Sequence, residues 1–226
     1  AVHPSDVAST QGTGFGGMES MRKMFVGRFL GEERPSDILQ EALPNVVAAH
    51  VMQSYIGGYG AMVQPVSACA TAAVSIEEGW DKIALGKADF VVAGAIDDIS
   101  IESVVGFGNM NATAEAAAMR AKGISDRHFS RANDRRRGGF VEAEGGGTVI
   151  LARGSVAARM GLPVAGVVGF VSSYADGAHT SIPAPGLGAL GAGRGGRSSR
   201  LAKALAALGV EADDIALVSK HDTSTG

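Results

Sequence analysis

The sequence predicts an α/β fold in which helices cover a sheet on both faces. The run Phe90-Val91-Val92-Ala93-Gly94-Ala95 is continuously apolar, which is typical of a strand buried on both sides. Residues 73–84 before it carry apolar side chains at helical spacing. Residues 61–66 form an earlier short apolar run that we interpret as another strand. Strand, helix and strand in this order predict a right-handed parallel crossover.

The other elements follow from the same periodicities and from glycine and proline breaks. Residues 9–18 are rich in glycine and predict a turn; a dinucleotide-binding loop is the less favoured alternative, because it needs a clear strand before it. We expect helices over residues 18–29, 46–55, 156–160 and 201–208, and a further helix capped by Asp37. We expect strands over residues 148–151, 163–171 and 215–218.

The composition indicates a soluble globular chain. Of the 226 residues, 46% are hydrophobic and 19% are charged, which allows a sizeable core. No apolar run is long enough to span a bilayer, so we expect no membrane partner. A single cysteine excludes an intrachain disulfide framework and suits a reducing cytoplasm, where we expect the protein. There is no signal-peptide pattern, and both ends of the chain suggest a piece of something longer.

A basic run over residues 126–137 is the main charged feature. The run is short and contains Asp126 and Asp134, which favours an ion-paired surface loop. A nucleic-acid groove needs basic residues spread along one face, with aromatic side chains for stacking. The formal net charge is −3, so we expect no nucleic-acid partner.

The only cysteine, Cys69, lies where the strand over residues 61–66 turns into the helix over residues 73–84. Its small neighbours leave room for a sharp turn and for a substrate. A thiol at a helix N-terminus faces unpaired N–H groups and the positive end of the helix dipole, which favour the thiolate. We therefore interpret Cys69 as a nucleophile that becomes acylated. Position and composition alone leave the alternative of a small buried hydrophobic residue.

His221 is expected, like Cys69, to follow directly after a strand. The strand over residues 215–218 leads directly to Lys220-His221-Asp222-Thr223-Ser224-Thr225. Ligands of open α/β sheets bind outside the carboxyl ends of the strands. A thiolate and an imidazole brought together there are suited to thioester chemistry.

With these residues identified, the sequence resembles the β-ketoacyl synthases, which are condensing enzymes of the thiolase superfamily. Residues 66–72 are similar to the nucleophile motif of that family, and residues 221–225 to its first histidine motif, His-Gly-Thr-Gly/Ser-Thr. Residues 139–145 match its glycine turn, which follows Arg131 and Arg137. Residues 37–41, 108–113 and 182–186 are similar to the ketoacyl synthase domain of actinobacterial and fungal type I fatty acid synthases in particular.

The resemblance implies a 3-oxoacyl-[acyl-carrier-protein] synthase, an acyltransferase of fatty acid biosynthesis. Cys69 would accept an acyl group from carrier-protein phosphopantetheine, and His221 would stabilise the enolate formed when malonyl carrier protein loses CO₂. Thr223 and Thr225 would hydrogen-bond the pantetheine arm. The family binds no metal or redox cofactor directly. The implied partners are acyl carrier protein, other fatty acid synthase domains and a second copy of the chain.

The resemblance also implies a thiolase-like layered α/β/α/β/α fold whose second half is incomplete. Residues 1–153 would form the first half, and residues 154–226 the start of the second. The second histidine and the catalytic lysine of the family would lie beyond residue 226, so we expect this polypeptide alone not to condense. Two alternatives are a non-catalytic condensing-fold partner and a thiolase-type acyltransferase acting on coenzyme A thioesters. Asp222 stands where most relatives have glycine; its carboxylate either raises the pKa of His221 or points away.

Overall fold

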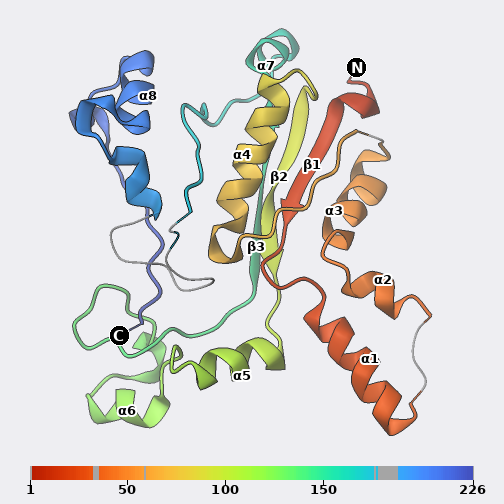
Figure 1. Ribbon diagram of the computed structural model, residues 1–226, viewed down its shortest axis with the longest axis vertical. Helices are drawn as coiled ribbons and strands as arrows, with labels where there is room; N and C mark the ends of the chain where they lie inside the picture. Colours follow the sequence, from red (N-terminus) through yellow and green to blue (C-terminus); the bar gives the residue numbers. More distant parts are fainter. Residues whose placement is uncertain (1, 33–35, 59, 176, 178–187, 226) are drawn as a thin grey trace. The chain divides into compact units, whose positions relative to one another are not determined.

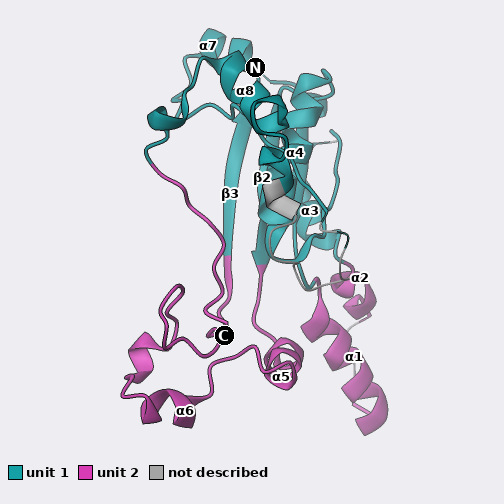
Figure 2. Cartoon of the chain, turned by 60° about the vertical axis from the view of Figure 1, so that its left-hand side comes forward, with its two compact units in different colours: residues 1–15, 44–96, 146–216 teal, residues 16–43, 97–145, 217–226 magenta. Residues whose placement is uncertain are grey.

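A computed structural model of the protein describes residues 2–32, 36–58, 60–175, 177 and 188–225. The chain forms two compact units (Figure 2). Unit 1 comprises residues 1–15, 44–96 and 146–216, and unit 2 comprises residues 16–43, 97–145 and 217–226. The segment over residues 182–186, which resembles type I multienzymes, lies outside the described residues.

A three-stranded sheet lies at the centre of unit 1, in the order β1-β2-β3 (Figure 1). Strand β1 spans Val7–Gly12, β2 spans Phe90–Asp97 and β3 spans Gly145–Ala152; the end residues Asp97 and Gly145 lie in unit 2. Strands β1 and β2 are parallel. Strand β3 runs antiparallel to β2, because Arg153 N donates to Asp89 O at one end and Gly147 lies against Gly94 further along. The strands predicted over residues 90–95 and 148–151 are confirmed.

Strand β1 is polar and buried, and the turn predicted over residues 9–18 is wrong for residues 9–12. Ser9, Thr10 and Gln11 are almost inaccessible to solvent. The Thr10 hydroxyl donates to the carbonyl of Ser75 at 2.7 Å, and the Thr148 hydroxyl donates to Oε1 of Gln11 at 3.1 Å. A buried strand can carry polar side chains when they find such partners, and hydrophobic periodicity does not detect a strand of this kind.

Helix α4, Thr71–Ala84, confirms the helix predicted after Cys69 and packs against the sheet (Figure 1). Its buried residues are small: Thr71, Ser75 and Gly79. Ile76 and Ile83 pack beside them against a cluster of Ala8, Ala88, Val91 and Ala93. Trp80, an apolar residue of the same helix, is 43% exposed, because the fully buried positions of α4 are occupied by the small residues Thr71, Ser75 and Gly79.

The remaining elements of unit 1 are short. Helix α3, Val46–Val51, continues into a π-helical turn over Met52–Ile56, as expected for residues 46–55. Helix α7, Gly154–Met160, ends at Gly161 in the left-handed conformation. Helix α8, Arg200–Leu208, begins at Ser199, whose hydroxyl accepts a hydrogen bond from Ala202 N, and ends at Gly209. These two helices were also predicted. Helical turns span Pro4–Asp6, Ala68–Ala70, Gly188–Gly193, Gly196–Ser198 and Ala212–Asp214.

Unit 2 consists of helices and loops. Helix α1, Met18–Leu30, confirms the helix expected there. It is followed by α2, Ile38–Ala42, α5, Ile101–Asn109, α6, Ala116–Ala121, and a turn over Asp126–His128. Asp37 occupies the N-cap position of α2 but makes no side-chain capping bond, so its predicted capping role is not realised. Met119, Ile124 and Phe129 form the buried cluster of this unit.

Three predicted strands are not formed as expected. Residues 61–66 make only an isolated parallel bridge between Met62 and Ser9. Residues 163–171 and 215–218 form no strand, and Val167 and Leu217 are 89% and 82% exposed. A strand needs a neighbour to take up its N–H and C=O groups, and within the described part of the chain neither run has one.

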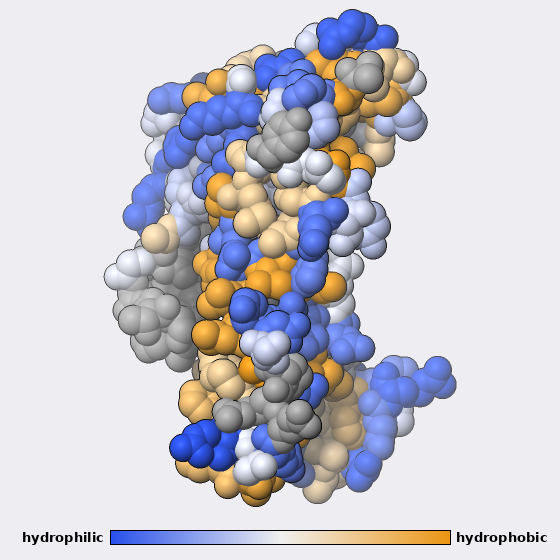
Figure 3. Space-filling view, turned by 90° about the vertical axis from the view of Figure 1, so that its right-hand side faces the viewer, coloured by the Kyte–Doolittle hydropathy of each residue, from blue (hydrophilic) through white to orange (hydrophobic). Residues whose placement is uncertain are grey.

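Apolar side chains are exposed on both units, and on the face drawn in Figure 3 they form orange areas between hydrophilic ones. Among the residues that the structure describes, every helix is too short or too polar to span a bilayer.

The close approach of α4 to the sheet predicts different effects for two helical glycines. A Cβ at Gly79 would lie 2.9 Å from Leu151 Cδ1 and 3.0 Å from Val91 Cγ1, whereas a Cβ at Gly106 in α5 meets nothing within 4 Å. We expect Gly79→Val to lower the free energy of unfolding by about 2 kcal/mol through overpacking. The matched control Gly106→Val should change it by less than about 0.5 kcal/mol. Urea unfolding of the two variants measures the difference, and equal effects would contradict the packing described here.

Candidate functional site

Cys69 lies in a tight turn of unit 1 that precedes α4. Ala68–Ala70 form a single 3₁₀ turn, in which Ala70 N donates to Ser67 O at 3.0 Å. Cys69 is exposed, so the alternative of a small buried hydrophobic residue is wrong. The residue before it, Ala68, has a φ of 47°, in the left-handed region that costs a non-glycine residue about 1–2 kcal/mol. The cysteine is therefore presented on a strained turn that the surroundings hold in place.

Thr71 holds this turn together. Its hydroxyl oxygen accepts a hydrogen bond from Ser67 N at 2.9 Å, and the hydroxyl donates to Ala68 O at 2.7 Å. Thr71 is 1% exposed. One buried hydroxyl thus fixes the backbone on the N-terminal side of Cys69: it gives Ser67 N an acceptor, and it adds a second bond to Ala68 O, which also accepts from Thr71 N.

The end of β1 approaches the same turn. A Cβ on Gly12 would lie 2.8 Å from Pro65 O and 3.0 Å from Ser75 Oγ, so only glycine fits there. Gln64 joins the two segments, since its amide can donate to Gln11 O at 2.6 Å and accept from Thr13 N at 2.8 Å. The segment before Cys69 is therefore fixed by side-chain contacts and one bridge, without the regular strand that the sequence predicts.

His221 lies in unit 2, in an irregular segment that a second loop anchors. Ser224 is buried, has a φ of 67°, and its carbonyl accepts a hydrogen bond from Gly139 N at 2.9 Å. Its hydroxyl oxygen accepts one from Arg131 N at 3.1 Å. Nε of Arg137 donates to Thr225 O at 2.6 Å. These bonds attach the chain after His221 to the loop over residues 131–139.

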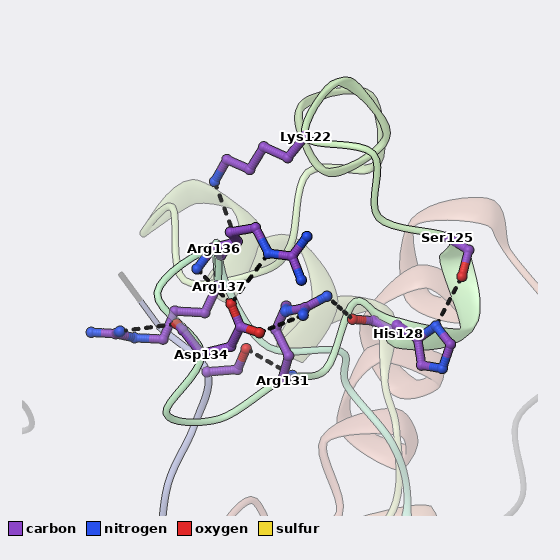
Figure 4. Close-up of polar contacts among 8 residues, drawn as sticks. Lys122, Ser125, His128, Arg131, Asp134, Arg136 and Arg137 are labelled. Atoms are coloured by element: carbon purple, nitrogen blue, oxygen red, sulfur yellow. Dashed lines mark hydrogen bonds and ion pairs between the residues drawn. The ribbon is translucent and has the colours of Figure 1, made fainter.

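Asp134 organises that loop (Figure 4). Its carboxylate accepts hydrogen bonds from Nη2 of Arg131 at 2.5 Å and from Arg136 N at 2.7 Å. The hydrogen bond from Arg131, then that from Arg136 N, and to a smaller extent the charges of the two arginines lower the pKa of the Asp134 carboxyl from 3.8 to about 2. Nearby, Lys122 Nζ donates to Arg136 O at 3.4 Å. The prediction of an ion-paired loop over residues 126–137 is thus confirmed.

Asp222 is held by the same loop. Its carboxylate accepts a hydrogen bond from Nδ2 of Asn133 at 3.2 Å and lies 3.1 Å from Nζ of Lys220. The Asn133 hydrogen bond, followed by that of Lys220, lowers the pKa of the Asp222 carboxyl. The sequence left open whether this carboxylate acts on His221 or points away from it. In the structure its hydrogen-bond partners are Asn133 and Lys220.

The structure places the predicted site residues in two groups. Cys69 belongs to unit 1, whereas His221, Thr223 and Thr225 belong to unit 2. The hydroxyls of Thr223 and Thr225 lie 2.8 Å apart, so these two residues are brought together. His221 is exposed and does not follow a regular strand. The prediction that both reactive residues follow regular buried strands is wrong.

Sequence reasoning missed the residues that hold the two reactive groups in place. Thr71 lies in the motif over residues 66–72 but has no predicted role of its own there, and Asn133 and Asp134 are predicted only as parts of an ion-paired loop. The signal that could have identified them is local: a threonine two residues after the cysteine, and aspartate among arginines. Only their contacts give these residues a role: Thr71 with Ser67, Asn133 with Asp222, and Asp134 with Arg131. Within the described part of the chain, no group of three His, Cys, Asp or Glu side chains could hold a metal ion.

Comparison with known proteins gives one family. The family model "Beta-ketoacyl synthase, N-terminal domain" matches residues 1–157. The chain is 37% identical over 224 residues to Fatty acid synthase 2 of Mycosarcoma maydis, an alignment that covers 99% of this chain and 6% of that protein. It is 39% identical over 198 residues to Fatty acid synthase subunit alpha of Emericella nidulans, covering 88% of this chain and 12% of that protein. The chain thus spans a small part of the length of these relatives.

Two solved structures are similar in fold. The ketosynthase FabY of P. aeruginosa matches with a TM-score of 0.73 and 27% identity, over 81% of this chain and 30% of that chain. A β-ketoacyl synthase of Burkholderia phymatum matches with a TM-score of 0.76 and 24% identity, over 100% of this chain and 52% of that chain. The thiolase-like α/β fold expected from the sequence is confirmed.

The Thr71 hydroxyl predicts a stability effect centred on the Cys69 turn. Thr71→Val removes the acceptor for Ser67 N and the donor to Ala68 O, which should lower the free energy of unfolding by about 1–2 kcal/mol. Thr71→Ser keeps the hydroxyl and should cost less. Urea unfolding gives the energies, and the rate of Cys69 alkylation reports the altered turn. If the valine variant were as stable as the serine variant, the hydroxyl would not hold the turn.

The lowered pKa of Asp134 predicts acid sensitivity in unit 2. A carboxyl whose pKa is lower in the folded than in the unfolded chain stabilises the fold above its unfolded value, here 3.8. That contribution should be lost as the pH falls through the folded value of about 2. NMR titration of the Asp134 side-chain carboxyl should give a midpoint near 2 in the folded chain and near 3.8 in urea. A folded midpoint near 3.8 would contradict the pairing with Arg131.

Proposed function

This chain belongs to the β-ketoacyl synthase family, and we propose that it is the 3-oxoacyl-[acyl-carrier-protein] synthase segment of a type I fatty acid synthase. The observation that carries the proposal is the exposed Cys69 on the strained turn fixed by Thr71. A nucleophile must be both accessible and held in one orientation, and this turn meets both needs.

The first step is acyl transfer to Cys69. The thiolate attacks the carbonyl carbon of an acyl thioester on carrier-protein phosphopantetheine. The new C–S bond to Cys69 forms, the old C–S bond breaks, and the pantetheine thiolate leaves and takes up a proton. The Cys69 backbone N–H, placed in the 3₁₀ turn before α4, is the donor that we assign to the developing oxyanion.

The second step is decarboxylative condensation. Malonyl carrier protein loses CO₂, and the electron pair of the broken C–C bond forms an enolate on the thioester. His221 donates a hydrogen bond to the enolate oxygen. The enolate carbon then attacks the carbonyl of acyl-Cys69, the C–S bond breaks, and the Cys69 thiolate is restored. The product is a 3-oxoacyl thioester two carbons longer.

Thr223 and Thr225 are the residues that we assign to the pantetheine arm. Their hydroxyls share a hydrogen bond at 2.8 Å, which leaves further donor and acceptor capacity for the amides of the arm. The implied partners are acyl carrier protein, other fatty acid synthase domains and a second copy of the chain. The segment binds no cofactor directly in this proposal, and it acts in the cytoplasm.

The domain assignment is part of the same proposal. Residues 1–153 form the N-terminal half of the ketoacyl synthase fold and residues 154–226 begin the second half; the match of the N-terminal domain model to residues 1–157 supports this boundary. Condensation is expected only from a polypeptide that also carries the second histidine and the lysine implied by the family resemblance.

The proposal predicts a covalent intermediate on Cys69. Incubation of the chain with an acyl-pantetheine thioester should add the mass of one acyl group, and peptide mapping should place it on residue 69. Cys69→Ala should abolish the adduct and, in a polypeptide competent for condensation, lower elongation by about 10³-fold or more.

The control variant is Ser67→Ala, which leaves the thiol in place and keeps the backbone N–H that bonds to Thr71. An adduct that persists in Cys69→Ala would refute the assignment. An unmodified wild-type chain would favour the non-catalytic alternative, and acylation by coenzyme A thioesters in preference to carrier protein would favour the thiolase-type one.

A further inference from the structure

Asp222 belongs to a closed network of three polar side chains. Asn133 Nδ2 donates to Oδ2 of Asp222 at 3.2 Å, Lys220 Nζ donates to Oδ1 of Asn133 at 3.3 Å, and Lys220 Nζ lies 3.1 Å from Oδ2 of Asp222. Each residue of the network therefore contacts both of the others. The contacts join positions 87 and 89 residues apart in the sequence.

The network joins the loop around Asn133 to the segment before His221, and these two segments differ in how they are held. Asn133 has a φ of 65°, a left-handed conformation that asparagine tolerates better than most residues, and it sits between Arg131 and Asp134, whose ion pair fixes the loop. The segment before His221 has no strand partner among the described residues. Asn133 is thus the fixed point to which Lys220 and Asp222 attach.

His221 is held on both sides as a result. Lys220 and Asp222 attach to Asn133, while Ser224 and Thr225 attach to the backbone of Arg131 and the side chain of Arg137. We propose that Asn133, Asp222 and Lys220 form a clamp that positions the His221 imidazole for the malonyl step. This inference rests on the proposed function, and it makes Asn133 and Asp222 positioning residues.

Position, and not stability, is the expected contribution of this clamp. The side chains of Lys220 and Asp222 are 62% and 30% exposed, and exposed ion pairs add little to the free energy of unfolding. A displacement of about 1 Å at a reacting group, in contrast, can cost about 10²-fold in rate. Among the described residues no hydrogen bond joins His221 to Asp222, and the charge of His221 is the last of the causes that lower the pKa of the Asp222 carboxyl. The positioning effect that we assign to the carboxylate therefore runs through the backbone that it anchors.

A reciprocal exchange tests the clamp. Asn133→Asp places two carboxylates against each other and should open the contact. Adding Asp222→Asn to it restores an amide and a carboxylate at the same two positions, with donor and acceptor exchanged and with a carboxylate still available to Lys220. The exposed Arg135, for which the described residues provide no hydrogen bond or ion pair, supplies the control Arg135→Gln on the same loop.

Amide hydrogen exchange on the chain itself tests the clamp and does not require the condensation reaction. Amides of residues 220–225 should exchange about tenfold faster in Asn133→Asp, and close to the wild-type rate in the double variant and in Arg135→Gln. Unchanged exchange in Asn133→Asp, or a double variant as fast as the single one, would overturn the clamp.

Kinetic measurements on a polypeptide competent for condensation test the effect of the clamp on catalysis. Malonyl decarboxylation should fall about 10-fold to 10²-fold in kcat in Asn133→Asp and recover in the double variant, while acylation of Cys69 stays at the wild-type rate. Loss of both activities together, or a change in KM alone, would overturn the positioning role. Failure of the proposed function would look different, because the wild-type protein would then lack the Cys69 adduct while the exchange pattern persisted.

Discussion

The hydroxyl of Thr71 is the contact on which the arrangement around Cys69 depends. It bridges Ser67 N and Ala68 O, and so it compensates the backbone for the left-handed conformation of Ala68. Thr71 is also buried on the face of α4 that meets β1. At this contact there is no room for a Cβ on Gly12. Packing of the sheet and presentation of the thiol are therefore one constraint: α4 must lie close to β1, and the turn before it must be tight.

In unit 2 the segment that carries His221 is held by contacts of a different kind. The residue before the cysteine is fixed by a neighbour in sequence, whereas the histidine segment is fixed by a loop 93 residues away, through Arg131 N and Ser224. The Asp134 carboxylate fixes that loop through its bond to Arg131, and the side chain of Asn133 connects the loop to Asp222. Several exposed or half-buried bonds, each weak on its own, define a position because they converge on one short segment.

The family match includes parts of both units. The match to the β-ketoacyl synthase N-terminal domain covers residues 1–157, which include the sheet, α4 and the loop over residues 131–139. Two of the three regions where predicted strands are not formed, residues 163–171 and 215–218, lie after it, whereas residues 61–66 lie within it. Apolar sequence is present in both runs, but the described chain supplies no strand to pair with them, and an unpaired run remains extended and exposed.

The sequence by itself determined the fold class, the helix after Cys69 and the buried strand at residues 90–95, and it singled out Cys69 and His221 as the residues proposed to react, because apolar periodicity and contiguous motifs are local properties. It failed for β1, whose polar side chains become compatible with burial only through Ser75 and Thr148. It also left the carboxylate of Asp222 undecided. Only the tertiary structure assigned that group, because its partner Asn133 is 89 residues distant, and hydrogen bonds between distant residues leave no periodic trace in a sequence.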